Sequence, residues 1–599
     1  MNNPVPARLA ALRVAMQQHG VTAVLVPGAD PHLSEYLPAH WSARTWLSGF
    51  DGSAGTLIVG REQAGLWTDS RYFAQAEQQL GGSGIALMKL RVPHTPEHLE
   101  WLQQQLHDGD VLAVAGDSVA VASRRQIEQR LAETGATVRT DLDLPGEIWT
   151  DRPALPASPV VEHALAWACV PRAEKFARLR KAMRKLGASH HLVSSLDDIA
   201  WLTNLRGSDV ECNPVFLAHL LVRADAGATL FVGRAKLDDA LVAALAADGI
   251  GIADYASITS ALPELGADDR LLLDSGRVVS SIAAAIAPEV VRIEAPNPST
   301  AFKAVKSAAE LDHVRDTMRR DGAALVRGFR RLEQRLAAGM TLTELDVDTL
   351  LHEERSAQPG WVGESFATIA GYQANGALPH YRATPQSHST LQAKGLLLID
   401  SGGQYLGGTT DITRVLALGE TTAEQRRDAT LVLKGMIALS RARFPKGASG
   451  PQLDALARAP LWAAGMDYGH GTGHGVGYFL NVHEGPHGIR APAPGGALVP
   501  LEPGMISPIE PGLYKPGRHG IRHENLAVVV EADRTEFGEF LAFETLTMCP
   551  FDRRALEPNL LNPEERAWLD DYHANVRAAL SPLLADADLE WLNRHCAPL

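Results

Sequence analysis

The chain has 599 residues, of which 45% are hydrophobic and 21% are charged, and its net charge is −14. This length exceeds that of one ordinary domain and indicates two to four domains, each able to build a core. The acidic balance, without a basic cluster, argues against nucleic acid as a partner. No apolar run reaches the ~20 residues that cross a membrane, and the N-terminus lacks the pattern of a secretory signal. Because its four cysteines are isolated, we expect a cytoplasmic protein with no membrane partner.

An internal repeat organises the first half of the chain. LAALRVAMQQHG ends at Gly20 and FARLRKAMRKLG ends at Gly187, and both predict a helix that stops at glycine. A short β-rich run follows each helix (TAVLV and HHLVS), and a Trp-Leu pair follows later in each copy. The shared order predicts two related α/β domains.

Two breaks in the pattern suggest domain boundaries. The Pro-rich stretch LPGEIWTDRPALPASP, residues 144–159, is typical of a linker. EAPNPST ends near residue 300, and a long helix is predicted from there to about residue 335. The third region is rich in glycine, histidine and short apolar strands, and ends in helices past Pro563, so we expect an α+β fold there.

Two predicted β-hairpins in the third region each carry two carboxylates. In the first, KGLLLID ends at Asp400 and TTDITRVLAL returns with Asp411. In the second, GMISPIEPGLY carries Glu510 and IRHENLAVVV carries Glu524. A carboxylate on a buried strand is costly unless it is paired or binds a metal. The nearby Arg414 and Arg522 could offset only part of this charge, so the pattern indicates bound cations.

The segment between the hairpins, DYGHGTGHGVGYFLNVHEGPHG, combines histidine with glycine. His470 and His474 have the HxxxH spacing of zinc-protease helices. However, Gly-Thr-Gly between them is a poor helix former, and the expected glutamate after the first histidine is absent. We therefore reject that interpretation and expect the glycines to mark close backbone packing against a ligand or strand.

Four carboxylates and one imidazole form a donor set dominated by oxygen. Such a set favours Mn²⁺ and also allows Zn²⁺, Co²⁺ or Fe²⁺ through the histidine. Four carboxylates are too many for one small cation. They suit two cations that lie ~3.5–4 Å apart and share bridging carboxylates. The sequence thus predicts two divalent metal ions per chain.

The ordered set Asp400, Asp411, His474, Glu510 and Glu524 resembles the ligands of the pita-bread metallopeptidases. The strings IDSGGQY, HGTGHGVGYFLNVHEGP and HENLAVVV are similar to the Xaa-Pro aminopeptidase branch. RTWLSGFDGSAGTLIV, SLDDIAWLTNLRGSDVECNPVF and FETLTMCPFDRR resemble its three-domain cytosolic form, so the resemblance covers nearly the whole chain. It implies two related N-terminal α/β domains, 1–155 and 156–301, and a pita-bread α+β catalytic domain with a helical C-terminal extension, 302–599.

The resemblance also implies a role for each ligand. Asp400 would bind one metal ion, His474 and Glu510 the other, and Asp411 and Glu524 both. A hydroxide held between the ions would attack the carbonyl of the bond before proline.

Four further residues receive roles by the same resemblance. His380, in LPHYR, would stabilise the tetrahedral intermediate or assist proton transfer. His483 would face the substrate, His470 would lie at the edge of the site, and Arg522 would orient ligands or substrate. A small apolar pocket for proline is expected near Phe366, Tyr372 and Tyr381.

The expected reaction removes the first residue from peptides whose second residue is proline. The resemblance also implies a homodimer. A prolidase limited to Xaa-Pro dipeptides is an alternative, although the three-domain length argues against it. A metal-free peptide- or protein-binding module is a second alternative, and a creatinase-like amidinohydrolase a weaker third. All five ligands remain in this sequence, which disfavours the last two.

Other polar residues of these segments have plainer interpretations. We expect Glu484 to be a hydrogen-bonding support residue rather than a ligand. Asp69 and Arg71 fit either a peptide-facing surface or a packing pair. We expect solvated or packing roles for His487, His519 and His523.

Overall fold

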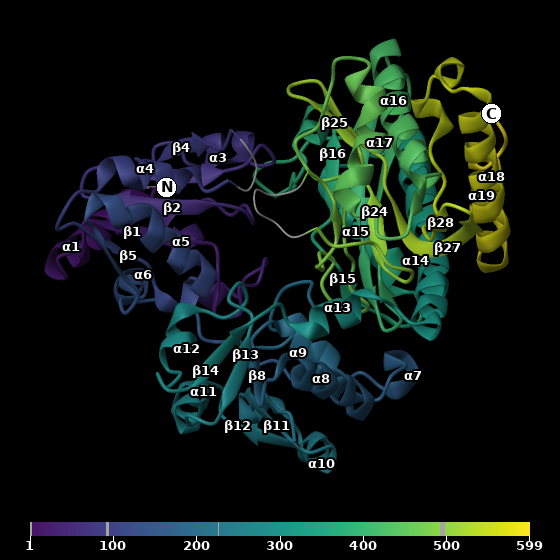
Figure 1. Cartoon of the computed structure of the whole chain (residues 1–599). Coiled ribbons are helices and arrows are strands. Elements are labelled where there is room, and N and C mark those ends of the chain that lie inside the picture. Colours follow the sequence, from purple (N-terminus) through teal and green to yellow (C-terminus); the bar gives the residue numbers. More distant parts are fainter. Residues whose placement is uncertain (1–2, 92–94, 226, 492–497) are drawn as a thin grey trace. The chain divides into compact units, whose positions relative to one another are not determined.

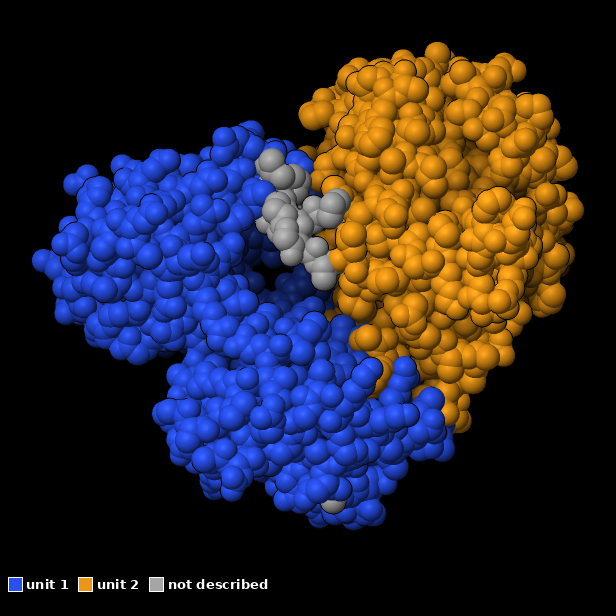
Figure 2. Space-filling model, viewed as in Figure 1, with its two compact units in different colours: residues 1–165, 170–300 blue, residues 166–169, 301–599 orange. Residues whose placement is uncertain are grey.

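The computed structural model describes residues 3–91, 95–225, 227–491 and 498–599. The chain forms two compact units, drawn as ribbons in Figure 1 and in blue and orange in Figure 2. Unit 1 comprises Met1–Leu165 and Val170–Thr300, and unit 2 comprises Ala166–Cys169 and Ala301–Leu599. Within the described ranges, no helix has the length and apolar character to cross a bilayer. The division into three domains at residues 155 and 301 stays a prediction.

The first half of unit 1 is a six-stranded sheet in the order β4-β3-β2-β1-β5-β6. Helix α1 (Val5–Gln18) buries Leu9, Leu12 and Met16, whose spacing of three or four residues places them on one face. The remaining elements are β1 (Ala23–Pro27), α2 (Ala43–Ser48), β2 (Thr56–Gly60), β3 (Ala64–Thr68), α3 (Phe73–Gln79), β4 (Ala86–Lys89), α4 (Glu97–Gln105), β5 (Val111–Ala113), α5 (Val121–Leu131), β6 (Thr137–Arg139) and α6 (Leu144–Ile148).

The second half of unit 1 repeats this arrangement with the order β12-β11-β10-β8-β13-β14. In both sheets the first strand after the long helix is central, antiparallel to the next long strand and parallel to a later one. The elements are α8 (Arg172–Leu186), β8 (His190–Val193), α9 (Leu196–Thr203), β10 (Ala218–Arg223), β11 (Ala228–Val232), α10 (Asp239–Ala247), β12 (Ile250–Ala253), α11 (Ile258–Ala261), β13 (Arg270–Leu273), α12 (Ser280–Ala284) and β14 (Val291–Glu294).

The predicted repeat is therefore confirmed strand by strand. Gly20 and Gly187 follow α1 and α8 with φ of 67° and 72°, the left-handed conformation that ends a helix. The Trp-Leu pairs lie on α2 and α9, which occupy the same place in each copy, directly after the central strand.

The structure corrects two predictions of local structure near these breaks. Residues 144–159 are not all linker, because α6 forms at their start and buries Leu144 in the core beside α1. The single helix expected from about residue 302 is two helices, α13 (Pro298–Ala304) and α14 (Ala308–Ala337). Ser307 caps the second helix in a reciprocal pair with Glu310, which satisfies the backbone donors where the new helix starts.

Unit 2 combines small antiparallel sheets with long helices. Its three larger sheets have the orders β15-β18-β19, β16-β17-β20 and β21-β28-β27-β24. The helices are α15 (Glu344–Ser356), α16 (Ala423–Ser440), α17 (Gly450–Trp462), α18 (Pro563–Leu580) and α19 (Asp586–His595). The strands are β15 (Trp361–Glu364), β16 (Ile369–Tyr372), β17 (Leu396–Ser401), β18 (Gly403–Tyr405), β19 (Gly408–Thr409), β20 (Ile412–Ala417), β21 (Arg443–Pro445), β22 (Gly473–His474), β23 (Gly488–Ile489), β24 (Ile506–Ile509), β25 (Gly512–Lys515), β26 (His519–Arg522), β27 (Asn525–Thr535) and β28 (Gly538–Thr545).

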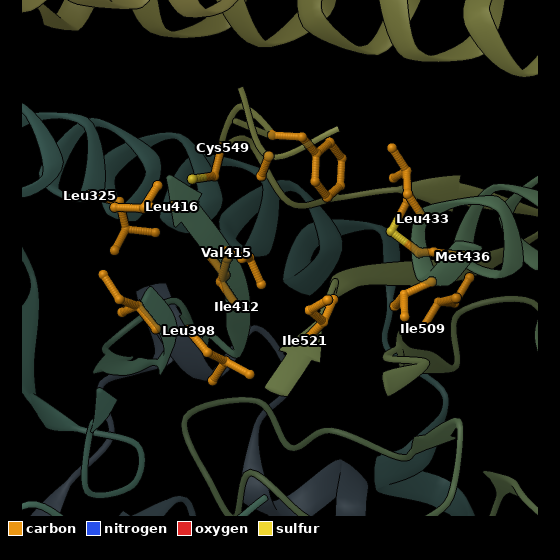
Figure 3. Packing of buried hydrophobic residues seen from close by; sticks show 14 of the residues in the cluster. Leu325, Leu398, Ile412, Val415, Leu416, Leu433, Met436, Ile509, Ile521 and Cys549 are labelled. Atoms are coloured by element: carbon orange, nitrogen blue, oxygen red, sulfur yellow. The ribbon is translucent and has the colours of Figure 1, made fainter. Parts of the chain in front are cut away.

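One apolar core joins the two predicted hairpins to the helices around them. Figure 3 shows Leu398 and Val415 from the first hairpin, Ile509 and Ile521 from the second, and Met436 of α16 gathered in this core. The C-terminal helices, predicted past Pro563, belong to the same core through α18 and Trp591 of α19. The strands that carry the carboxylates thus start from a rigid, well-packed base.

Candidate metal centre

The first hairpin places Asp400 and Asp411 side by side in the interior. β17 and β20 pair antiparallel, with Asp400 opposite Thr413, and Asp411 directly precedes β20. Both residues are buried, with 8% and 5% of their surface exposed. The hairpin predicted from the sequence is therefore correct.

The second hairpin is also confirmed, but it changes sheets at its two carboxylates. β24 pairs with β27 in one sheet, and β25 pairs with β26 in another. Glu510 directly follows β24 and Glu524 directly precedes β27, so both residues lie where the hairpin passes from one sheet to the other. Neither glutamate is part of a paired strand at this position.

His474 reaches the carboxylates because its backbone packs closely against β24. A Cβ on Gly473 would lie 2.1 Å from the carbonyl oxygen of Pro508, so only glycine fits there. The segment forms the short strand β22 and no helix, as the glycines predict. The His474 Nε2 atom lies 3.5 Å from Asp411 Oδ2 and 3.8 Å from Glu510 Oε1. His474 Nδ1 lies 3.0 Å from the Gly475 carbonyl oxygen and donates to it, which turns Nε2 toward the carboxylates.

These side chains form a cluster suited to metal ions. Ligand atoms of Asp411, His474 and Glu524 all lie within 4.8 Å of one another. Glu510 joins them through His474, and Asp400 joins through Arg522, whose Nη2 lies 2.5 Å from Asp400 Oδ2. All five predicted ligands therefore converge on one region of unit 2.

The electrostatics of the cluster fit divalent cations. Burial raises the pKa of Asp400, and burial raises the pKa of Glu510 to about 7. Burial, reinforced by the neighbouring carboxylates, raises the pKa of Glu524 well above its ordinary value. Asp400 Oδ1 is buried without a hydrogen-bond partner. Carboxylates with raised pKa values and an orphaned oxygen match a donor set that metal ions complete.

Arg522 is the cation of this cluster, and its side chain is almost fully buried. Besides Asp400, it donates to the Tyr514 hydroxyl at 2.6 Å and to the Thr413 hydroxyl at 3.1 Å. Thr413 in turn donates to Glu524 Oε2 at 2.5 Å. Arg522 and Thr413 thus link the two hairpins and hold Asp400 and Glu524 in place.

Two of the other predicted histidines lie around the cluster. The His483 ring stands edge to face on His474, with centroids 4.3 Å apart. His470 Nε2 lies 2.8 Å from the Tyr514 hydroxyl, which connects it to Arg522. Both rings are half-buried.

His380 lies on a separate segment, after the short 3₁₀ turn Gln373–Ala377. This turn packs against β26, where the Gly376 carbonyl oxygen would lie 1.6 Å from a Cβ on Gly520. β26 ends at Arg522, so the segment that carries His380 is docked on the strand leading to the metal cluster.

Sequence reasoning missed Thr413 and Tyr514, and for Arg414 it expected only an offset of part of the carboxylate charge. Thr413 follows Asp411 by two residues, so strand alternation could have placed it on the same face. Arg414 faces the opposite way and is fully buried, and its guanidinium donates to the carbonyl oxygens of Glu524 and Cys549 at 2.6 and 2.7 Å. It fixes the backbone beneath a ligand, which no local sequence signal shows.

The residues for which a structural role was expected lie in ion pairs or in buried positions. Glu484 is a support residue, as expected, because its buried carboxylate pairs with Lys303 and Lys306 at 3.5 and 3.2 Å. Asp69 and Arg71 form an ion pair at 2.7 Å. Buried packing positions are occupied by His487, His519 and His523.

The pocket predicted for proline gains no support from its two tyrosines. The Tyr372 hydroxyl donates to the Lys394 carbonyl oxygen at 2.9 Å, and the Tyr381 hydroxyl donates to Glu344 at 2.8 Å. Both hydroxyls therefore hold the chain together, while Phe366 is half-buried. The pocket itself stays a prediction.

Two repeated α/β sheets followed by carboxylate-bearing hairpins with a histidine strand define a metallopeptidase of the pita-bread class. Residues 316–531 match Metallopeptidase family M24, and residues 539–599 match the C-terminal region of peptidase_M24. Residues 8–150 and 151–310 each match a Creatinase/Prolidase N-terminal domain. The chain belongs to the Xaa-Pro aminopeptidase P branch of metallopeptidase family M24.

The relatives that support this assignment span the whole chain. A protein of Laccaria bicolor named "Probable Xaa-Pro aminopeptidase P" is 40% identical over 99% of this chain and 93% of its own length. A Paracoccidioides brasiliensis protein of the same name is 39% identical over 99% of both chains. The structure of an X-prolyl aminopeptidase from Caenorhabditis elegans, described as a cytosolic enzyme with a di-nuclear active site, is 33% identical and superposes with a TM-score of 0.94 over 99% of both chains. The dipeptidase PepE from Mycobacterium ulcerans covers only 64% of this chain, with a TM-score of 0.51 and 25% identity.

Proposed function

We propose that the chain is a dinuclear metallo-aminopeptidase that releases the first residue from peptides whose second residue is proline. The observation that carries the proposal is the convergence of Asp411, His474 and Glu524 ligand atoms within 4.8 Å, among buried carboxylates with raised pKa values. Full-length relatives named Xaa-Pro aminopeptidase P support the substrate class.

The residues proposed to hold the metal are the five that the sequence singled out. Asp400 would contact one ion, His474 and Glu510 the other, and Asp411 and Glu524 both. Two bound divalent cations would supply Lewis acidity and a water of lowered pKa. We propose Mn²⁺ in both positions because the donor set is mostly oxygen.

The other side chains of the site act by orientation and proton handling. Arg522 holds Asp400 and Tyr514, and through Thr413 it holds Glu524, so these groups keep one arrangement during turnover. We propose that His380 stabilises the oxyanion or transfers a proton to the leaving proline nitrogen. His483, packed on His474, would face the substrate, and His470 would close the edge of the site through Tyr514.

The test compares substrates with the purified, Mn²⁺-loaded protein. Peptides of the form Xaa-Pro-Xaa should lose their first residue, an Xaa-Ala-Xaa control should not, and an Xaa-Pro dipeptide should be a poorer substrate than the longer peptide. Preference for the dipeptide would instead establish a prolidase. Elemental analysis should give about two metal ions per chain. A value near zero with no turnover would establish a peptide- or protein-binding module.

Three further expectations belong to this proposal. The chain would form a homodimer, which sedimentation would detect as twice the 64.3 kDa chain mass. It would reside in the cytoplasm, where cysteine thiols such as those of the buried Cys549 and Cys596 remain reduced. Its domains would divide at residues 155 and 301, which limited proteolysis can test.

A further inference from the structure

Glu344 is a fully buried carboxylate at the start of α15, in a part of unit 2 that the metal site does not use. Within the described chain it forms no ion pair with a lysine, arginine or histidine. A buried carboxylate without a cation is costly, so its surroundings must supply hydrogen bonds. The N-terminal end of a helix adds a favourable dipole and accounts for part of the compensation.

The hydrogen bonds to Glu344 all come from one segment, residues 372–389. The backbone N–H of Tyr372 donates to Oε1 at 2.7 Å, and the Asn375 side-chain amide donates to both carboxylate oxygens at 3.0 Å. The Tyr381 hydroxyl donates to Oε2 at 2.8 Å, and the Ser389 backbone N–H donates to Oε2 at 2.6 Å. One carboxylate therefore fastens the start, the middle and the end of the segment.

The network is closed by contacts among its own members. The Asn375 amide also lies 3.0 Å from the Tyr381 hydroxyl and 2.9 Å from the Ser389 hydroxyl. The backbone N–H of Glu344 donates to the Ser389 carbonyl oxygen at 3.1 Å. Such a connected set of buried polar groups specifies one arrangement of the backbone.

His380 directly precedes Tyr381, so the hydrogen bond from Tyr381 to Glu344 fixes the backbone next to His380. The start of the segment is docked by Gly376 on β26, and Glu344 fixes the remainder relative to that point. We propose that Glu344 is a positioning residue for His380, holding the 372–389 segment so that the imidazole keeps a fixed place beside the strand leading to Arg522. This inference rests on the proposed role of His380.

The first test is a Glu344→Gln variant of the full-length, Mn²⁺-loaded protein. A glutamine amide nitrogen cannot accept from the donors around Glu344, so at least one point of the segment is released. We expect kcat to fall about 10- to 100-fold, within the contribution of a well-placed acid–base group, with KM changed much less. The metal content should be unchanged because no ligand lies on the segment.

Hydrogen exchange supplies a readout that does not depend on activity. Backbone amides of residues 373–389 should exchange faster in Glu344→Gln, whereas those of β17 and β24 should not. The matched control is Glu353→Gln on the same helix, a half-exposed glutamate that pairs with Arg331 on the surface. It should match the wild type in both measurements.

A double variant separates positioning from general stability. If Glu344 acts through His380, then His380→Ala with Glu344→Gln should lose no more kcat than His380→Ala alone. Multiplicative losses, or loss of metal from Glu344→Gln, would overturn the proposal. If Glu344→Gln fails to fold, Tyr381→Phe removes one donor in its place and should show the same pattern more weakly; an unchanged exchange rate there would also overturn it. Wild-type protein that cleaves no Xaa-Pro peptide would count against the proposed function, while the exchange result would still judge the role of Glu344.

Discussion

Unit 2 buries carboxylates in two opposite kinds of surroundings. Burial alone would raise the pKa of Glu333 on α14, but contacts with His595, Arg554 and Trp591 lower it to about 2. At the metal cluster the same effect of burial wins, and the pKa of Glu510 rises to about 7. The cationic groups around Glu333 outweigh its burial, whereas His474 and Arg522 lower the pKa of Glu510 by less than burial raises it.

Other clusters of unit 2 follow the first pattern. Asp321 and Arg355 are both fully buried and lie 2.7 Å apart, and the Glu484 carboxylate has two lysines. Only at the hairpins do four carboxylates share one guanidinium and one imidazole among the described side chains. A group of buried carboxylates with too few cations therefore identifies the metal site, whereas the single carboxylate of Glu344 is compensated by hydrogen bonds.

The largest effect is expected from a change within the metal cluster that contains Asp411, His474 and Glu524. Asp411→Asn removes a carboxylate 3.5 Å from His474 while keeping its shape, so the fold should survive. We expect kcat/KM on an Xaa-Pro-Xaa peptide to fall at least ~10³-fold, equivalent to about 4 kcal/mol of transition-state stabilisation. Circular dichroism should match the wild type, and elemental analysis should show lost metal.

The matched control for this change is Asp533→Asn on the exposed part of β27, which should keep full activity. Retained turnover in Asp411→Asn would refute the dinuclear mechanism.

The next largest effect is expected at the buried Asp321–Arg355 pair, whose charges offset each other. Asp321→Asn leaves the buried Arg355 with only the more distant carboxylate of Glu364, 3.7 Å away, and it also weakens the hydrogen bonds from Tyr405 and Thr410. Removing one member of a buried pair costs about 3–5 kcal/mol, which denaturant unfolding would measure. A double variant, Asp321→Leu with Arg355→Met, should recover part of the loss. A cost below about 1 kcal/mol, the range of exposed pairs, would show that pairing does not stabilise this cluster.

The contribution of Glu333 to the free energy of unfolding should depend on pH. Because the folded-state pKa of Glu333 is lowered from 4.5 to about 2, its contribution is complete above pH 4.5 and disappears as the pH falls toward 2. A shift of this size corresponds to about 3 kcal/mol. Glu333→Gln should therefore be less stable than wild type at pH 6, and the difference should shrink steadily in acid. A difference that stays constant with pH would mean that charge plays no part; the exposed Glu564→Gln serves as control.

The sequence predicted those features of the site that depend on strand pattern and residue order. The hairpins, their four carboxylates and His474 were all found from apolar runs and from the ordered ligand set. The break before α14 was missed because the apolar pattern continues across Ser307, although the capping pair with Glu310 is visible in the sequence.

The contacts between distant segments could not be predicted. Arg522 meets Thr413 across 109 positions, and Glu344 meets donors that lie 28 to 45 positions further along the chain. Strand alternation tells which face a side chain occupies, but not which other segment it meets there. Such partners follow only from the packing of the two hairpins and α15.

Neutralising Glu510 should change stability less than the variants above, and in the opposite direction to neutralising Asp321. In metal-free protein, Glu510→Gln removes one of several buried charges that repel one another, so its free energy of unfolding at pH 8 should rise by about 1–3 kcal/mol. The equivalent change at Asp321 should lower it. With Mn²⁺ added, wild type should gain stability and Glu510→Gln should gain much less, because a proposed ligand is lost. If neutralising Glu510 destabilised the metal-free protein as neutralising Asp321 does, then the two clusters would be alike, and the argument from missing charge to metal would fail.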